Sequence, residues 1–194
     1  MRYVFKITIS GISQPQVWRR VAIPADYSFF KFHKVIQIIF GWENIHSFEF
    51  FDATETDPLH IFMPHEKIED YDMRAADASK THLRDIFSED KKQYSYRYDS
   101  NDNWIHDIVL EDISDEVLKC PRCHGGEGMC PPEGCGGPKE YQHIKYLLNE
   151  KPDSDEARRC REWLFMEDDD VFDPSYFPEA ETEEINEILG RFAK

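Results

Sequence analysis

The sequence predicts an α+β fold in a single domain over residues 1–194: a mostly antiparallel or mixed β-sheet, covered by one helix from the N-terminal half and by C-terminal helices. Three observations predict it. Apolar residues alternate with polar ones in several short runs, which is typical of strands. Apolar residues at helical spacing occur once early and three times late in the chain. The length of 194 residues suits one domain with its own core, and no internal repeat is present.

The first two strands are expected at residues 3–9 and 17–23. Odd-numbered residues from Tyr3 to Ile9 are apolar, as in a half-buried strand. In the second run, apolar residues share one face with Arg19, and Pro24 ends the strand.

A helix is expected at residues 27–40, with Asp26 as its N-cap and Gly41 as the residue that closes it. Two further strands follow at residues 47–51 and 58–63. Residues 66–92 are polar, and we expect there a long excursion with one short helix at Leu83, Ile86 and Phe87.

A β-hairpin is predicted from residues 94–99 and 103–110, because the turn Ser100-Asn101-Asp102 contains residues that tolerate positive φ. Residues 120–138 are rich in Gly, Pro and Cys and predict an irregular loop. Three helices are expected after it, at 139–149, 154–165 and 181–193.

Composition limits the function. With 40% hydrophobic and 14% aromatic residues the chain is not disordered, and no apolar run is long enough to span a bilayer, so we expect no membrane association. The formal net charge of −16 repels phosphate backbones, so direct nucleic-acid binding is disfavoured and a basic partner protein or a cation is favoured. Residues 1–6 resemble a strand, so we expect no signal peptide and a cytoplasmic protein.

The strongest chemical signal is a cluster of four cysteines, Cys120, Cys123, Cys130 and Cys135. The first two have the two-residue gap that lets both thiolates bind one tetrahedral ion, and the glycines within residues 125–137 let the backbone turn tightly around it. We therefore predict one structural zinc ion. Its alternative ligands are His46, His106 and His124. Reduced, unliganded cysteines in an ordered loop are the other interpretation.

A second cluster surrounds the predicted hairpin turn and contains Asp99, Asp102, Trp104 and His106. Trp104 and His106 share a strand face, and Asp102 can orient His106 for acid–base work or ligand binding. In the structural interpretation, which the pattern favours, Asp102 caps the turn and His106 is a core histidine.

Weaker candidates for ligand binding lie elsewhere. Arg20 can bind an anion beside Trp18. A pocket can be lined by residues of the predicted helix and of the segment after it, namely His33, Gln37, Trp42 and His46. Phosphate-loop, dinucleotide, zinc-protease and nucleophile-elbow motifs are absent, so the sequence carries no nucleotide or flavin signature.

Several motifs together resemble the Ri-plasmid ORF-3-like family, whose members are often labelled TnpR-like passenger proteins of insertion elements. The resemblance extends over nearly the whole chain and implies no assigned molecular function. It rests on Pro15-x-x-Trp18-Arg19-Arg20, His33-x-x-x-Gln37, Gly41-Trp42-x-x-x-His46, Tyr98-Asp99-x-x-Asp102-x-Trp104-x-His106, Cys123-x-x-Gly126, Cys130-Pro131-Pro132-Glu133-x-Cys135-Gly136-Gly137-Pro138, Phe172-Asp173-Pro174 and Asn186.

The chain departs from the family pattern at three positions. Asn101 replaces a turn glycine, Gly134 replaces an aspartate, and Cys120 is an additional cysteine. The resemblance therefore implies a shared metal set of Cys123, Cys130 and Cys135, with Cys120 or a histidine as the fourth ligand.

Two functions remain open. The first is a non-enzymatic binding or interaction protein with a zinc-stabilised Cys-rich loop, an accessory of a mobile element that binds a protein partner. The second is a hydrolase-type enzyme that uses Asp102, His106 and Glu133 near His46. Site-specific recombination is disfavoured because no basic DNA-binding helix accompanies the negative charge.

Overall fold

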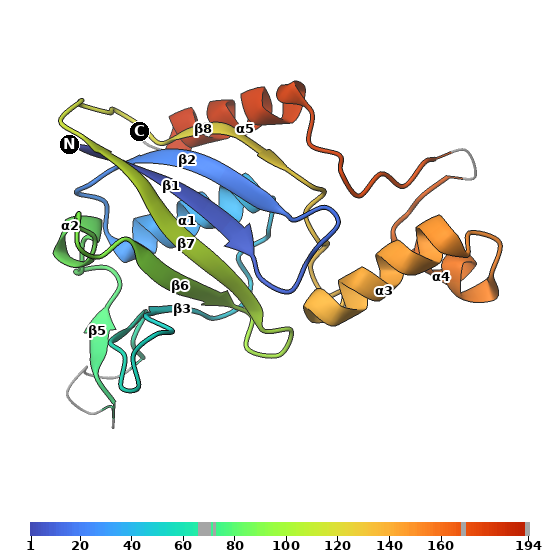
Figure 1. Cartoon of the computed structure of the whole chain (residues 1–194), viewed down its shortest axis with the longest axis horizontal. Coiled ribbons are helices and arrows are strands. Elements are labelled where there is room, and N and C mark those ends of the chain that lie inside the picture. Colours follow the sequence, from blue (N-terminus) through green and yellow to red (C-terminus); the bar gives the residue numbers. More distant parts are fainter. Residues whose placement is uncertain (66–70, 72, 168–169, 193–194) are drawn as a thin grey trace.

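The structure is a computed structural model that describes residues 1–65, 71, 73–167 and 170–192. Within these residues, eight strands form one mixed sheet in the order β5-β4-β3-β6-β7-β1-β2-β8 (Figure 1). All neighbouring strands are antiparallel except β4 and β5, which are parallel. The predicted α+β class is therefore confirmed. The strands are β1 Arg2–Ile9, β2 Trp18–Pro24, β3 Phe48–Phe51, β4 His60–Phe62, β5 Ala75–Asp77, β6 Gln93–Tyr98, β7 Trp104–Ser114 and β8 Arg122–Glu127.

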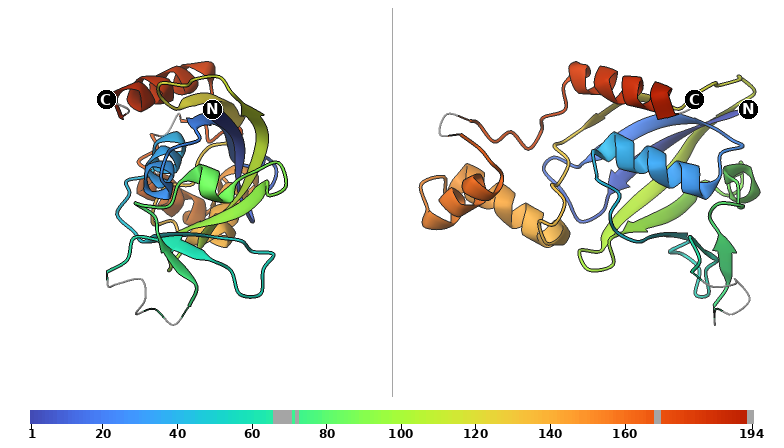
Figure 2. Two further views of the ribbon diagram at one scale, coloured as in Figure 1. Left: turned by 90° about the vertical axis from the view of Figure 1, so that its left-hand side faces the viewer. Right: turned by 180° about the vertical axis from the view of Figure 1, so that it is seen from behind.

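Helix α1, Phe29–Phe40, lies across one face of the sheet, as the view from behind in Figure 2 shows. It begins at Ser28, whose side chain accepts a hydrogen bond of 3.3 Å from the Lys31 N–H, so the predicted Asp26 cap is wrong. Gly41 ends it with φ of 71°, as predicted.

The core lies between α1 and the inner face of the central strands. Phe5 of β1 contacts Phe32 of α1 with ring centroids 5.1 Å apart, and both side chains are fully buried. Phe50 of β3 stacks on the same Phe32 ring at 5.5 Å. The alternation that predicted β1 and the helical spacing that predicted α1 therefore meet in one aromatic core.

The remaining helices are α2 Leu83–Ile86, α3 Gly137–Glu150, α4 Asp155–Trp163 and α5 Glu179–Phe192. The short α2 confirms the expected helix in the polar excursion. Helix α5 lies along β8, while α3 and α4 extend beyond the end of the sheet as an arm (Figures 1 and 2). None of the helices among the described residues is long and apolar enough to cross a membrane.

Two strands were missed from the sequence. β5 lies inside the predicted excursion, and β8 lies inside the Gly-, Pro- and Cys-rich loop. β8 pairs with β2, and a Cβ at Gly126 would lie 2.4 Å from the Trp18 carbonyl oxygen. Glycine is required at this position because the two backbones approach closely. For this reason the Gly-rich composition of residues 120–138 predicted a loop where the structure has an edge strand.

Candidate functional site

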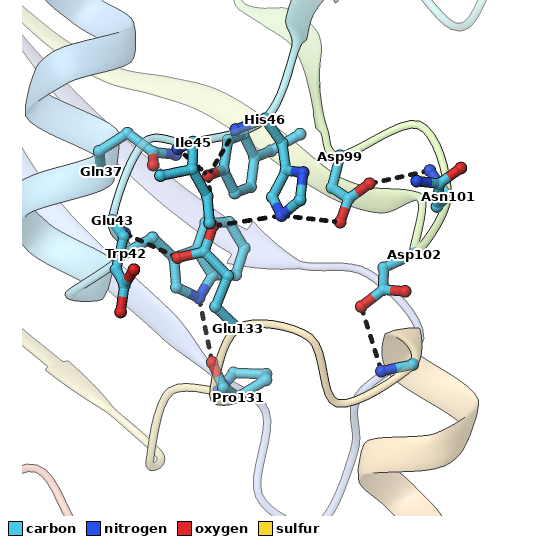
Figure 3. A network of polar contacts seen from close by, with 12 residues as sticks. Gln37, Trp42, Glu43, Ile45, His46, Asp99, Asn101, Asp102, Pro131 and Glu133 are labelled. Atoms are coloured by element: carbon cyan, nitrogen blue, oxygen red, sulfur yellow. Dashed lines mark hydrogen bonds and ion pairs between the residues drawn. The ribbon is translucent and has the colours of Figure 1, made fainter.

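Three segments meet at one end of the sheet, as Figure 3 shows: the connection from α1 to β3, the β6–β7 turn, and the segment between β8 and α3. They bring together His46, Asp99 and Glu133, which are far apart in the sequence. Trp42 supports the group from below, because its ring stacks on Tyr98 at 5.0 Å and its Nε1–H donates to the Pro131 carbonyl at 3.0 Å.

The His46 side chain lies between two carboxylates. Its Nε2 is 3.4 Å from Asp99 Oδ2 and 3.8 Å from Glu133 Oε1. The imidazole is 32% exposed, whereas the carboxylates are only 6% and 13% exposed. Two acceptors beside Nε2 favour the tautomer with its hydrogen on Nε2. In the neutral imidazole Nδ1 is then an acceptor, and none of the residues that the structure describes donates to it.

Glu133 accepts hydrogen bonds from two donors. The Glu43 N–H donates to its Oε2 at 2.7 Å, and the Tyr98 hydroxyl donates to its Oε1. Burial raises the pKa of Tyr98, so this phenol stays protonated and remains a donor. The Ile45 N–H in turn donates to the Tyr98 oxygen at 3.0 Å. These contacts fix the carboxylate relative to the backbone around His46.

Asp99 and Asp102 have different partners. Asp99 has φ of 55° and accepts a hydrogen bond of 2.9 Å from the Asn101 N–H. Asp102 accepts one of 3.1 Å from the Gly136 N–H, which ties the turn to the start of α3. Positive φ occurs at Asp99 and Asn103, so the expectation that Asn101 adopts it is wrong. The carboxylate beside a histidine is therefore Asp99, next to His46, and not Asp102 next to His106, the pair in the functional interpretation of the sequence.

His46 also lines a cavity of about 460 Å³, formed beside β3, β4 and β6. Its walls are mostly apolar, with side chains from Phe48, Phe62 and Met73. Arg97 is the guanidinium in the wall, and it pairs with Glu49, which accepts a second contact from His60 Nδ1 at 2.8 Å. A cavity of this size, with an apolar wall and a few polar groups, is typical of a small-molecule site.

The other predicted catalytic histidine is elsewhere. His106 is fully buried, and its Nδ1 lies 3.2 Å from the Trp104 carbonyl oxygen. Burial lowers the pKa of His106 to about 3, so it stays neutral. Trp104 is buried as well. The hydrolase pocket predicted from Asp102, His106, Glu133 and His46 is therefore not assembled, because only Glu133 and His46 meet.

The predicted ligand-binding residues have structural partners. His33 Nδ1 and Gln37 Nε2 both contact the Tyr96 hydroxyl, at 2.8 and 3.0 Å, inside the core. Burial lowers the pKa of His33 to about 4. Arg20 pairs with Glu111 at 2.6 Å on the outer face of the sheet. These three residues, and Trp104, do not line the cavity beside His46.

Of the four clustered cysteines, Cys123 lies on β8, Cys120 precedes this strand, and Cys130 and Cys135 follow it. Strand β8 alone, between Cys120 and Cys130, spans about 20 Å at the rise of an extended chain. His124 lies exposed on this strand, next to the buried Cys123. Among the described residues, no group of three or more His, Cys, Asp and Glu side chains is arranged to hold a metal ion. The zinc site thus stays a prediction without geometric support.

A guanidinium lies near two of these thiols. Arg19 is fully buried, and its guanidinium nitrogens donate hydrogen bonds to the carbonyl oxygens of Ile39, Trp18, Glu127 and Gly128. Its charge acts on the thiols of Cys123 and Cys130. Burial nevertheless raises the pKa of both thiols, so they are protonated when no metal ion is bound.

Sequence reasoning missed the cavity itself. Its polar wall is a cross-strand pair, since Glu49 of β3 faces Arg97 of β6 in the register. Opposite charges at matching positions of two predicted strands are the signal that could have found this pair. His65 and Tyr71 also line the cavity, and Tyr71 lies in the excursion at residues 66–92, for which the sequence predicted only one short helix.

Comparison with known proteins agrees with the motif pattern. The family model described as plasmid pRiA4b ORF-3-like protein matches residues 1–181. The chain belongs to this family. One relative is the uncharacterized protein y4hQ of Sinorhizobium fredii (strain NBRC 101917 / NGR234), which is 30% identical over 166 residues that cover 85% of this chain and 81% of the relative.

A solved structure of similar fold is that of the protein of unknown function MM3350 from Methanosarcina mazei Go1. Its crystal structure matches with a TM-score of 0.78 and 30% identity, over 93% of this chain and 97% of the other. The family match and the similar structure support the fold, and the names of these two relatives state no activity.

Proposed function

We propose that this chain is a binding protein whose cavity beside His46 takes a small organic ligand. The observation that carries the proposal is the combination of a mostly apolar cavity of about 460 Å³ with an imidazole held at its wall by two buried carboxylates. Such pockets give affinity through apolar contact and orientation through a few fixed polar groups.

The polar groups favour an amine with an apolar body. Nδ1 of His46 is an acceptor in the tautomer that Asp99 and Glu133 favour, so the ligand must bring a donor. The distribution of charge around the cavity also favours an amine. Arg97 is neutralised by Glu49, whereas the two carboxylates share one imidazole, which leaves negative charge behind the cavity. An ammonium group supplies both the donor and the positive charge.

Calorimetric titration with paired probes tests this proposal. We expect 2-phenylethylamine to bind and 3-phenylpropanoate, which has a similar skeleton and the opposite charge, not to bind. His46→Phe keeps a ring and removes the acceptor, and we expect it to weaken amine binding at least about tenfold, the effect of losing one hydrogen bond to a charged group. His143→Ala, a change at an exposed histidine on α3, is the matched control.

Equal binding of the amine and the acid would contradict the charge argument. Amine binding that survives His46→Phe unchanged would contradict the assignment of the site. A variant with an unchanged circular dichroism spectrum and melting temperature excludes misfolding as the cause of lost binding.

A second candidate is acid–base catalysis by the same histidine. One observation favours it: His46 is oriented by carboxylates, as histidines that act as general bases are. Discrimination requires turnover. An amine that is bound and recovered unchanged supports the binding protein, whereas loss of a bound amide or ester in wild type but not in His46→Phe supports the enzyme.

The zinc-stabilised loop and the mobile-element role are separate predictions, and the His46 site supports neither. Elemental analysis of protein purified without added zinc tests the loop. About one zinc per chain, lost in Cys123→Ser, supports it, whereas folded metal-free protein contradicts it.

A further inference from the structure

The arm formed by α3 and α4 ends in a segment that combines acidic and aromatic residues. Residues 162–173 contain six acidic side chains and no basic one. Two large aromatic side chains at the end of α4 are exposed, Trp163 by 45% and Phe165 by 93%. Val171, on the far side of the acidic run, is 86% exposed. Large exposed apolar groups among polar ones mark protein interaction surfaces.

The exposed aromatics are held in place by their neighbours. Leu164 and Met166, which alternate with them, pack against the hydrophobic core. The Phe165 backbone has φ of 55°, and its N–H donates to the Glu162 carbonyl at 3.2 Å. Since a phenylalanine rarely adopts this conformation, the chain directs the ring outward at a local cost in conformational energy.

Arg161 binds two backbone carbonyl groups of the acidic residues that follow the aromatics. Its Nη2 donates to the carbonyl oxygens of Glu167 and Asp170, the second at 3.0 Å. The Glu167 N–H also donates to Asp170 Oδ2 at 2.7 Å. These contacts preorganise the described part of the segment, and a preorganised surface loses less entropy when it binds.

We propose that this surface, Trp163 and Phe165 with the flanking carboxylates of Glu162, Glu167 and Asp170, docks a basic protein segment that carries apolar side chains between its lysines or arginines. Charge complementarity identifies the occupant. A second copy of a chain with a net charge of −16 would bring like charges together, whereas a basic segment is attracted and its apolar side chains cover the aromatic rings.

The test uses a synthetic helical peptide with leucine on one face and lysine on the other, labelled for fluorescence anisotropy. We expect it to bind wild type, and its affinity to fall at least about tenfold in the double variant Trp163→Ser/Phe165→Ser, as for loss of interface aromatics. Val117→Ser is the control, because Val117 is 81% exposed and lies outside the arm. A second peptide with glutamine in place of leucine reports binding by charge alone.

Three results would overturn the proposal: no binding of the leucine and lysine peptide, equal affinity of wild type and the double variant, or a wild-type dimer in analytical ultracentrifugation that the double variant loses. The last would mean that a second copy covers the surface. Because both substituted side chains are exposed, we expect the double variant to keep its melting temperature and its binding of 2-phenylethylamine. The docking surface and the His46 cavity therefore fail or succeed independently.

Discussion

Replacing Arg19 by alanine should destabilise the fold far more than replacing its neighbour Arg20. The Arg19 guanidinium makes five hydrogen bonds of 3.0–3.2 Å to four carbonyl oxygens, and it lies 3.6 Å from the centroid of the Phe177 ring. It also lies 3.8 Å from Glu181 of α5. One side chain therefore connects β2, the end of α1, the segment after β8 and the C-terminal region.

The magnitude follows from the groups that the substitution leaves behind. The bonds to Ile39 and Gly128 are buried, and each buried carbonyl left without a donor costs about 1–3 kcal/mol. Loss of the contact with Phe177 adds about 1–2 kcal/mol. Part of this is offset, because the variant no longer buries a charge. We expect Arg19→Ala to lower the free energy of unfolding by about 4 kcal/mol, a large share of the roughly 5–15 kcal/mol of a typical domain.

Urea denaturation followed by circular dichroism measures this loss. Arg20→Ala is the control on the same strand, since its ion pair with Glu111 is partly exposed and contributes below about 1 kcal/mol. If Arg19→Ala does not fold, Arg19→Lys supplies the measurement: it keeps the charge but has fewer donors, and we expect an intermediate loss. Equal small losses in Arg19→Lys and Arg20→Lys would refute the reasoning.

Two further predictions concern pH and the sheet edge. Burial lowers the pKa of His106 to about 3 and of His33 to about 4, so between pH 7 and pH 5 only the unfolded chain gains these protons. The free energy of unfolding should therefore fall by about 4 kcal/mol in total over this range. Denaturation measured at a series of pH values should show that His106→Leu roughly halves this fall. A pH dependence unchanged by that substitution would contradict the assignment. The Asn186 side chain accepts a hydrogen bond from the Cys123 N–H at 2.8 Å and donates one to the Cys123 carbonyl at 2.9 Å. Asn186→Ala should therefore lower the free energy of unfolding in urea by about 2 kcal/mol, whereas Asn149→Ala, at an exposed position, should leave it almost unchanged. Equal effects would mean that α5 does not secure the β8 edge.

Local patterns were sufficient for much of the fold. β1 and α1 were predicted within two residues of their observed starts because their apolar periodicity reflects burial against each other. β8 could not be predicted, because its strand conformation comes from backbone pairing with β2 and its glycines are selected by close approach rather than by strand propensity. Propensity carries no information about a partner strand a hundred residues away.

The site was predicted in part for a similar reason. His46 and Glu133 were named as candidates from their residue types, and they do meet. The third member is Asp99 rather than Asp102, a choice made by the backbone of the turn, where Asp99 has φ of 55°. The alternation of β2 places Arg19 on the apolar face of the strand. The sequence does not show which groups pair with a buried arginine, since these carbonyls come from other segments of the fold. For this reason the sequence favoured Arg20 as the candidate for ligand binding.

The proposed site rests on a hydrogen bond that a bound amine donates to Nδ1 of His46. Nitrogen-15 NMR of protein labelled in its histidines measures this directly, with and without 2-phenylethylamine. We predict that free His46 shows the tautomer with hydrogen on Nε2, and that the amine shifts the Nδ1 resonance of His46 while those of His33 and His106 stay in place. A His46 protonated on Nδ1, or a Nδ1 resonance that the amine leaves unchanged, would contradict the account.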